Sequence, residues 1–151
     1  MDAFSVRTKI MIGGGMDALA QRLHRVFLVT DKFMAESGKT NYVTDRLLRS
    51  GGEFKIFSDV QADPDIATVT RGVEQILEFQ PDAVVAFGGG SAIDAAKAIV
   101  FFAARERDMR DCKFIAIPTT SGTGSEVSRF AVITDQEKGG KYPLVEESML
   151  P

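Results

Sequence analysis

Short apolar runs alternate along the chain with longer stretches in which apolar side chains recur at helical spacing. The runs are rich in β-branched residues and end at polar residues or glycines, a pattern typical of buried strands. The predicted strands cover residues 25–31, 54–57, 83–87 and 113–118. The predicted helices between them cover residues 40–50, 63–80 and 91–104, each with one apolar face.

Strict alternation of strand and helix predicts an α/β fold with a doubly wound, mostly parallel, Rossmann-like sheet. Two further extended segments, 129–134 and 141–145, flank a glycine-containing turn at 136–140 and predict a β-hairpin near the C-terminal end. The 151 residues fit one domain of ordinary size, so we expect residues 1–151 to fold together.

Composition excludes several classes of protein. The pI near 5.2 argues against a general nucleic-acid surface, and no apolar run approaches the ~20 residues of a membrane span. The first residues show no secretory leader, and the single cysteine, Cys112, suits a reducing compartment, so a cytoplasmic protein is expected. His24 is the only histidine, which leaves no histidine-rich metal centre. A magnesium site built only from carboxylates stays possible, and any catalysis must use serine, threonine, lysine, aspartate or glutamate side chains, or groups supplied from elsewhere.

A glycine-rich turn follows the third predicted strand, at Gly88–Asp94. Glycines allow a sharp turn and close approach of a ligand, and the helix that follows presents free N–H groups to an anion. The turn matches neither a Walker loop nor the Gly-x-Gly-x-x-Gly fingerprint. Two interpretations stay open: a phosphate cradle, or a plain turn in which Ser91 caps the helix and Asp94 completes a capping box.

A hydroxyl-rich loop follows the fourth predicted strand, at Pro118–Glu126, with five hydroxyls and two glycines in nine residues. Hydroxyls donate hydrogen bonds to phosphate and ribose oxygens. The alternative is a turn capped by Thr123 or Ser125. Because ligands of parallel sheets bind beyond the carboxyl ends of the strands, two such loops at successive strand ends favour a shared phosphate site.

Asp31 ends the first predicted strand. A carboxylate there can accept hydrogen bonds from a ribose diol and would repel a 2′-phosphate. It can equally cap a helix, and it precedes the glycine turn, whereas the usual dinucleotide fingerprint has the acid after the glycines. Both interpretations of Asp31 stay open.

The segments Gly88–Ala98 and Pro118–Ser128 resemble the two signature loops of the iron-containing (group III) alcohol dehydrogenases, and Val29–Asp31 and Val132–Asp135 also match that pattern. The branch of ethanolamine- and propanediol-utilisation alcohol dehydrogenases looks most similar. The resemblance implies NAD(H) binding. The residues it assigns to the cofactor are Asp31, Gly89, Gly90, Ser91, Asp94, Thr119, Thr120, Thr123, Val132 and Lys141.

The resemblance also implies a role for each position. Asp31 would hold the adenosine ribose, the glycine turn would line the pyrophosphate, and the threonines would contact phosphate and ribose. Asp94 and Val132 would lie near the nicotinamide, and Lys141 would reach toward the ribose. The roles of Val132 and Lys141 rest on the resemblance alone. Asp63 stands where the family often has asparagine, which puts one adenine-side contact in doubt.

Family members are more than twice as long, and a helical second domain supplies one aspartate and usually three histidines to a divalent metal, iron or zinc. None of these ligands occurs in this sequence, so the resemblance implies the NAD(H)-binding domain only, with no metal ligand and no catalytic side chain of its own. We expect this domain to be inactive alone and homo-oligomeric. The complete enzyme would interconvert a primary alcohol and an aldehyde, in the cytoplasm or in a bacterial microcompartment. The alternatives are a domain like that of glycerol-1-phosphate dehydrogenase or dehydroquinate synthase, and a non-catalytic nucleotide-binding module.

The predicted helix 91–104 carries a lysine and two phenylalanines whose positions can be predicted from helical spacing. Lys97 lies one helical turn after Asp94 and is expected to form a surface or near-site pair with it. Phe101 and Phe102 are expected in the core, with only one of the two fully inward.

Overall fold

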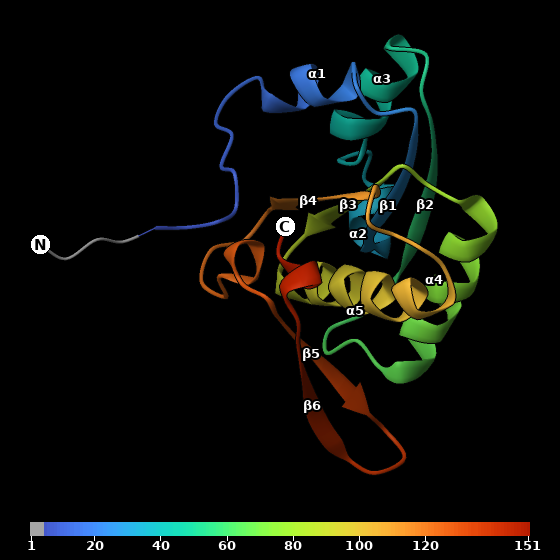
Figure 1. Cartoon of the computed structure of the whole chain (residues 1–151), viewed down its shortest axis with the longest axis vertical. Coiled ribbons are helices and arrows are strands. Elements are labelled where there is room, and N and C mark those ends of the chain that lie inside the picture. Colours follow the sequence, from blue (N-terminus) through green and yellow to red (C-terminus); the bar gives the residue numbers. More distant parts are fainter. Residues whose placement is uncertain (1–4) are drawn as a thin grey trace, which may run out of the picture.

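The computed structural model describes residues 5–151. Four parallel strands form the central sheet in the order β2-β1-β3-β4 (Figure 1). The strands are β1 (Arg25–Asp31), β2 (Glu53–Val60), β3 (Ala83–Gly88) and β4 (Lys113–Pro118). Two more strands, β5 (Phe130–Asp135) and β6 (Gly140–Val145), pair antiparallel as a hairpin. The predicted α/β fold with a mostly parallel sheet and a terminal hairpin is confirmed.

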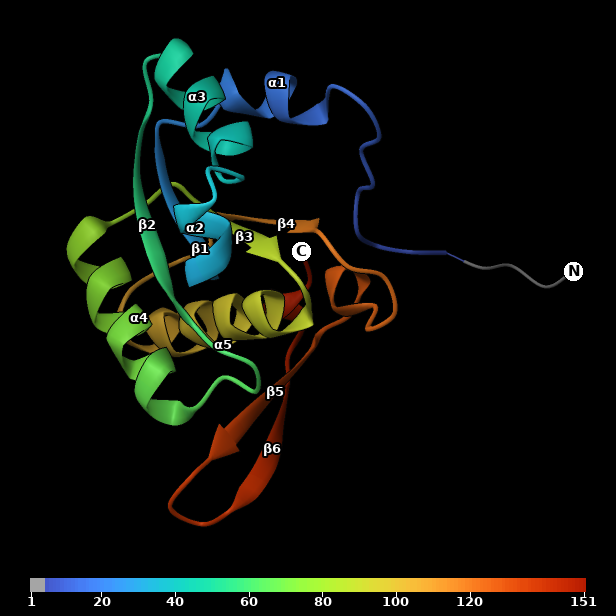
Figure 2. The same ribbon diagram turned by 180° about the vertical axis from the view of Figure 1, so that it is seen from behind.

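Helices cover both faces of the sheet, because every connection between neighbouring parallel strands must cross over. The helices are α1 (Gly15–Ala20), α2 (Lys32–Glu36), α3 (Asn41–Arg49), α4 (Ile66–Phe79) and α5 (Gly90–Glu106). In Figures 1 and 2, α1 and α3 lie on one side of the strands and α4 and α5 on the other. Short 3-10 helices occur at Ser125–Val127 and Glu147–Met149.

The sheet separates two apolar cores. On the α4 and α5 side, Phe27 and Val84 pack with Ile76 and Ile99. On the α1 and α3 side, Leu28 packs with a second cluster from the two short helices and β3. The strand β3 is buried along its whole length, as expected for a central parallel strand.

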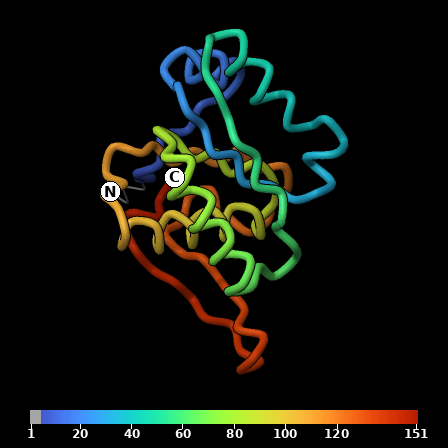
Figure 3. Tube along the Cα trace, turned by 90° about the vertical axis from the view of Figure 1, so that its right-hand side faces the viewer, coloured from blue at the N-terminus to red at the C-terminus, as the bar shows by residue number. Residues whose placement is uncertain are grey.

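The hairpin β5–β6 extends beyond the helical layer (Figure 3). One face of β5 still joins the core, where Ile133 packs against the α4 and α5 side together with Leu144 of β6. Close to the hairpin turn, the Thr134 N–H donates to the Pro64 carbonyl at 3.0 Å, which ties the hairpin to the loop before α4. The hairpin is therefore attached to the rest of the fold along the inward face of β5.

Two local expectations differ from the structure. Helix α4 begins at Ile66, with Asp65 as its N-cap, so Pro64 lies outside the helix. Neither Phe101 nor Phe102 is fully buried, since Phe101 is half-buried and Phe102 is exposed. The two rings instead form an edge-to-face pair with centroids 5.1 Å apart, and Arg105 lies over Phe101.

Candidate functional site

The order of the strands creates a crevice between the carboxyl ends of β1 and β3. From β1 the chain crosses to β2 on one side, then returns past β1 to β3 on the other, which is a topological switch point. The ladder between β1 and β3 ends at Val29 and Ala86. Beyond it, the Thr30 hydroxyl donates to the Phe87 carbonyl at 2.7 Å, which satisfies a buried acceptor where the strands separate.

The glycine turn lies at this crevice. Gly88 adopts φ 154°, and a Cβ there would stand 2.9 Å from the Ala92 Cβ, so only glycine fits. Helix α5 begins at Gly90, and its N-cap, Gly89, makes no side-chain capping bond. Of the two interpretations left open, the capping box is therefore wrong: Ser91 lies inside the first turn, and Asp94 accepts the Val132 N–H. A 17-residue helix thus directs its first N–H groups, without a side-chain cap, at the crevice.

The threonine loop after β4 lies directly against this turn. A Cβ on Gly89 would stand 3.0 Å from Thr120 Oγ1, and a Cβ on Gly90 would stand 2.8 Å from Thr123 Cγ2. The Thr119 N–H donates to the Gly88 carbonyl at 2.9 Å. The two predicted loops therefore share one edge of the sheet, and their contact requires the absence of side chains at Gly89 and Gly90.

Asp31 combines the two interpretations that the sequence left open. Its Oδ1 accepts the Met34 N–H at 2.8 Å, so Asp31 is the N-cap of α2. Its Oδ2 lies 3.9 Å from the position of a Cβ on Gly88. The second carboxylate oxygen is therefore beside the glycine turn while the first is occupied by the cap.

Asp94 and Val132 meet where α5 faces the start of the hairpin. Asp94 Oδ2 accepts the Val132 N–H at 3.1 Å, and among the described residues its Oδ1 is shielded from solvent without a hydrogen-bond partner. Burial raises the pKa of the Asp94 carboxyl, against the lowering effect of the Val132 N–H. The structure thus places two predicted positions in direct contact next to the crevice.

Lys97 is fully buried, which excludes the surface position that was one half of the expectation, and its hydrogen bonds go to partners other than Asp94. Its ammonium donates to three backbone carbonyls of the segment that follows the threonine loop. The sequence did carry a signal for this, since Lys97 shares a helical face with apolar Ile93 and Val100 at spacings of four and three. A lysine on an apolar face indicates a buried ammonium with partners on another element.

Lys141 lies on the exposed hairpin strand β6, and its Nζ is 2.9 Å from Asp63 Oδ1. Asp63 has φ 53°, a left-handed conformation that aspartate and asparagine share more readily than other residues. Asp63 therefore adopts a backbone conformation that is also accessible to asparagine, the residue that the resemblance led us to expect at this position. In this structure Lys141 pairs with Asp63, and its role toward a ribose stays a prediction.

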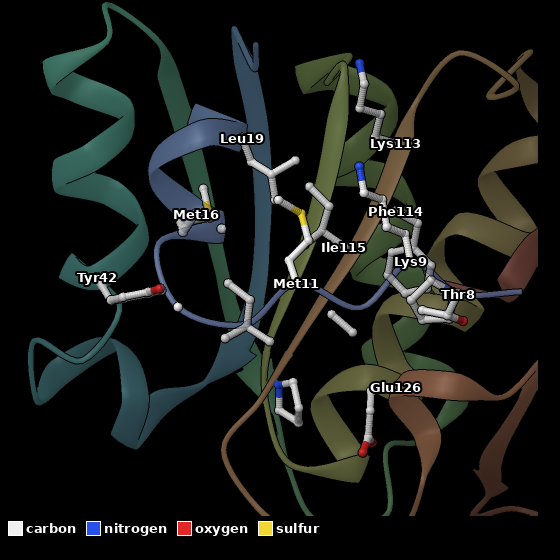
Figure 4. Close-up of a pocket in the computed structure, with 16 residues that line it drawn as sticks. Thr8, Lys9, Met11, Met16, Leu19, Tyr42, Lys113, Phe114, Ile115 and Glu126 are labelled. Carbon is white, nitrogen blue, oxygen red and sulfur yellow. The ribbon is translucent and has the colours of Figure 1, made fainter. Parts of the chain in front are cut away.

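One cavity lies away from this turn, along β4 on the α1 side of the sheet (Figure 4). It has a volume of about 430 Å³, and its walls include Met11, Met16, Leu19, Ile115 and Glu126. A second cavity of about 320 Å³ lies between α4, α5 and the hairpin, lined by apolar side chains such as Val73, Phe102 and Leu144. Neither of these two cavities includes the glycine turn.

The described residues do not suit a metal ion. Across residues 5–151 no group of three or more histidine, cysteine or acidic side chains is placed to hold one. His24 is exposed and directly precedes β1, at the opposite end of that strand from Asp31. Cys112 is half-buried, and burial raises its pKa to about 11, so it stays a neutral thiol near pH 7. Over the same residues, no helix has the length and apolar character needed to cross a membrane.

Comparison with known proteins assigns the family. Residues 8–151 match the family model of iron-containing alcohol dehydrogenases, and the chain belongs to that family. The 1-propanol dehydrogenase PduQ of Citrobacter freundii is 42% identical over 153 residues, which cover 100% of this chain and 41% of the relative. This chain therefore spans about two fifths of the length of that curated relative.

Solved structures agree in fold. An iron-containing alcohol dehydrogenase from Thermococcus thioreducens superposes with a TM-score of 0.85 at 29% identity, covering 99% of this chain and 45% of that one. A sulfoacetaldehyde reductase from Bifidobacterium kashiwanohense, solved in complex with NAD+, gives a TM-score of 0.82 at 31% identity, covering 100% and 44%. The resemblance carried by the two loops is confirmed.

Proposed function

We propose that this chain is the NAD(H)-binding part of a metal-dependent alcohol dehydrogenase that interconverts a primary alcohol and an aldehyde. The observation that carries the proposal is the contact between the glycine turn and the threonine loop at the N-terminus of α5. A diphosphate bears negative charge and many acceptor oxygens. The crevice offers the matching groups, namely helix N–H groups at the positive end of a dipole and hydroxyls on an adjacent loop.

Each part of the crevice has a proposed task. The backbone at Gly89, Gly90 and Ser91 binds the pyrophosphate, because only a turn without side chains allows such close approach. Thr119, Thr120 and Thr123 donate hydroxyl hydrogen bonds to the phosphate and the adjoining ribose. These groups bind and orient, and none of them exchanges a proton with substrate.

The nicotinamide side lies toward Asp94 and the start of the hairpin. Val132 presents a half-exposed apolar side chain there, while its N–H is held by Asp94. An apolar wall of this kind limits access of water to one face of a bound ring. When bound, the cofactor supplies the hydride acceptor or donor of the reaction.

Asp31 sets the preference for NAD over NADP in this proposal. Its Oδ1 is committed to the α2 cap, and its Oδ2 remains available to a ribose hydroxyl. A 2′-phosphate at that point would meet a carboxylate of the same charge. The NAD+ complex of the sulfoacetaldehyde reductase relative supports this choice of cofactor.

The residues of this site are proposed to bind the cofactor and not a metal ion. The family name implies iron, and the described residues offer no ligand set for iron or zinc. We therefore assign no chemical step to a metal here, and we expect no alcohol oxidation by this chain alone.

A cytoplasmic, homo-oligomeric protein remains our expectation. The reduced, half-buried Cys112 supports the first part, and apolar Ile10 and Ile12 at the surface support the second.

Calorimetric titration of the purified chain with NADH and NADPH tests the proposal. We expect saturable binding of one NADH per chain, weaker binding of NADPH, and no turnover when NAD+ and 1-propanol are added together. Absence of NADH binding would overturn the cofactor assignment. An ordinary enzymatic rate with alcohol would overturn the assignment of a purely cofactor-binding role.

A further inference from the structure

Lys97 occupies an unusual position in the middle of α5. Its side chain is 0% exposed, on a helix whose other buried side chains are all alanine, isoleucine or valine. Removing an ammonium from water is costly unless acceptors replace the water. The surroundings of Lys97 must therefore supply those acceptors. The acceptors show which segment of the chain the lysine binds.

The acceptors all come from one short segment. Lys97 Nζ donates to the carbonyl oxygens of Ser125 at 2.5 Å, Ser128 at 2.6 Å and Phe130 at 2.9 Å, and it lies 3.3 Å from Ser128 Oγ. An ammonium has three protons, so the three carbonyls use its whole donor capacity. The segment 125–130 joins the threonine loop to β5, and Lys97 fixes its path.

Asp94 provides a further hydrogen bond between α5 and the segment that follows the threonine loop. It lies one turn before Lys97 on α5 and accepts the Val132 N–H. Between Ser125 and Val132, α5 therefore holds the backbone at four points, three through carbonyls and one through an N–H. The same helix begins at Gly90, so one rigid element carries the glycine turn and fixes the exit of the threonine loop.

We propose that Lys97 is a positioning residue of the cofactor site, which sets the separation between the threonine loop and the glycine turn. The inference rests on the proposed function, since it explains how both loops reach one diphosphate. Lys97 does not contact phosphate itself, because its protons are directed at the backbone carbonyls. Its effect reaches the cofactor through the placement of Thr119, Thr120 and Thr123.

The charge of Lys97 suits this task near neutral pH. Burial lowers the pKa of the ammonium to about 8, and the nearby carboxylates of Asp94 and Glu126 oppose that lowering. At pH 7 the side chain is mainly protonated and keeps all three donors. An apolar side chain of similar length would fill the same space and leave the three carbonyls without their partner.

The test compares Lys97→Met and Lys97→Ala with the wild-type chain, using the fluorescence of bound NADH for affinity and amide hydrogen exchange without cofactor for loop order. Lys138→Met, which removes an exposed lysine from the hairpin turn, is the matched control. We expect both Lys97 variants to stay folded, to bind NADH about tenfold more weakly or worse, and to exchange faster over residues 119–130. Propylammonium, the missing part of the side chain, should restore affinity to the alanine variant but not to the methionine variant.

Wild-type affinity in both Lys97 variants would overturn the proposal. So would loss of NADH binding that occurs only together with global unfolding, because Lys97 would then act on the fold and not on the site. If the wild-type chain itself fails to bind NADH, the proposed function fails. The exchange data then decide the positioning role separately: faster exchange over 119–130 in the variants supports it, and unchanged exchange overturns it.

Discussion

The two loops of the candidate site reach similar positions by different means. The turn at Gly88–Ser91 is partly to fully buried and is fixed by its own backbone, by a strand of the core and by the first turn of α5. The loop at Thr119–Thr123 is exposed, and its position depends on one backbone bond to Gly88 and on the attachment of its far end to Lys97.

The difference separates local from tertiary control of a binding site. A glycine turn between a strand and a helix is largely specified by residues adjacent in sequence. In the threonine loop, Thr123 Oγ1 accepts the Ser125 N–H at 3.3 Å, whereas the path of the loop as a whole depends on contacts with other elements. The two loops, though both suited to phosphate, should therefore be disturbed by different substitutions.

The largest effect is expected at the turn itself. Gly90→Val places side-chain atoms where Thr123 now lies, since even a Cβ would be 2.8 Å from Thr123 Cγ2. Separation of the two loops should weaken NADH binding roughly 100-fold, with little change in thermal unfolding. Gly14→Val is the control, because it also precedes or begins a helix but meets only Asp17 Oδ2 at 3.7 Å. Unchanged affinity in Gly90→Val would show that the contact is irrelevant to binding.

The next effect concerns the choice of cofactor. Asp31→Asn keeps an acceptor for the Met34 N–H and removes the negative charge. We expect the ratio of NADPH to NADH affinity to rise about tenfold, as a charge repulsion of roughly 1–2 kcal/mol is lost. Asp31→Gly, which also removes the cap, should change the ratio similarly but lower stability. An unaltered ratio in both variants would refute the ribose assignment.

A smaller effect, on stability, is expected at the N-terminus of α4, which has a side-chain cap, whereas α5 has none. Asp65 accepts the Thr68 N–H at 2.8 Å, and this bond lowers the pKa of its carboxyl. Asp65→Ala should reduce the free energy of unfolding by about 1 kcal/mol at pH 7, measured by urea denaturation, without affecting NADH binding.

The pH dependence of this difference has a definite sign. A carboxyl whose pKa is lower in the folded chain contributes stability that is fully present above the unfolded value near 3.8. The contribution is lost as the pH falls through the lower folded pKa. The gap between wild type and Asp65→Ala should therefore shrink in acid, while Asp65→Asn should show less pH dependence. A gap that widens below pH 3.8 would contradict the cap.

The smallest effect is expected in the threonine loop. Thr120→Val keeps the shape that contacts Gly89 and removes one hydroxyl, so NADH affinity should fall about threefold, as for one neutral hydrogen bond. Thr70→Val, on the outside of α4, is the control, because that hydroxyl bonds only to its own helix at Ile66. An equal response of the two variants in NADH titrations would remove Thr120 from the site.

Patterns local in sequence predicted the fold and one half of the site. The β-branched run Ala83–Phe87 and the glycines after it specify a buried strand and a sharp turn without reference to the rest of the chain. The hydroxyl-rich loop was also identified, because its composition is unusual directly after a strand. These features depend on residues that are neighbours along the chain.

The remaining features depend on contacts between distant residues. The capping box did not form, since α5 begins at Gly90 and Asp94 accepts the Val132 N–H 38 positions away. The burial of Lys97 is indicated by its apolar helix face, but its carbonyl partners are not, because they lie on a segment whose approach no periodicity reveals. The exposure of Phe101 and Phe102 was not predicted, because the sequence does not show which face of a helix is covered by another element.

The most direct measurement of the central claim is an amide NMR titration of the isotope-labelled chain with NADH. The account predicts that amides of Gly89, Gly90 and Ser91 and those of residues 119–123 shift together, saturating at the same NADH concentration. Saturable shifts confined to the cavity along β4, or to only one of the two loops, would contradict a diphosphate site shared between them.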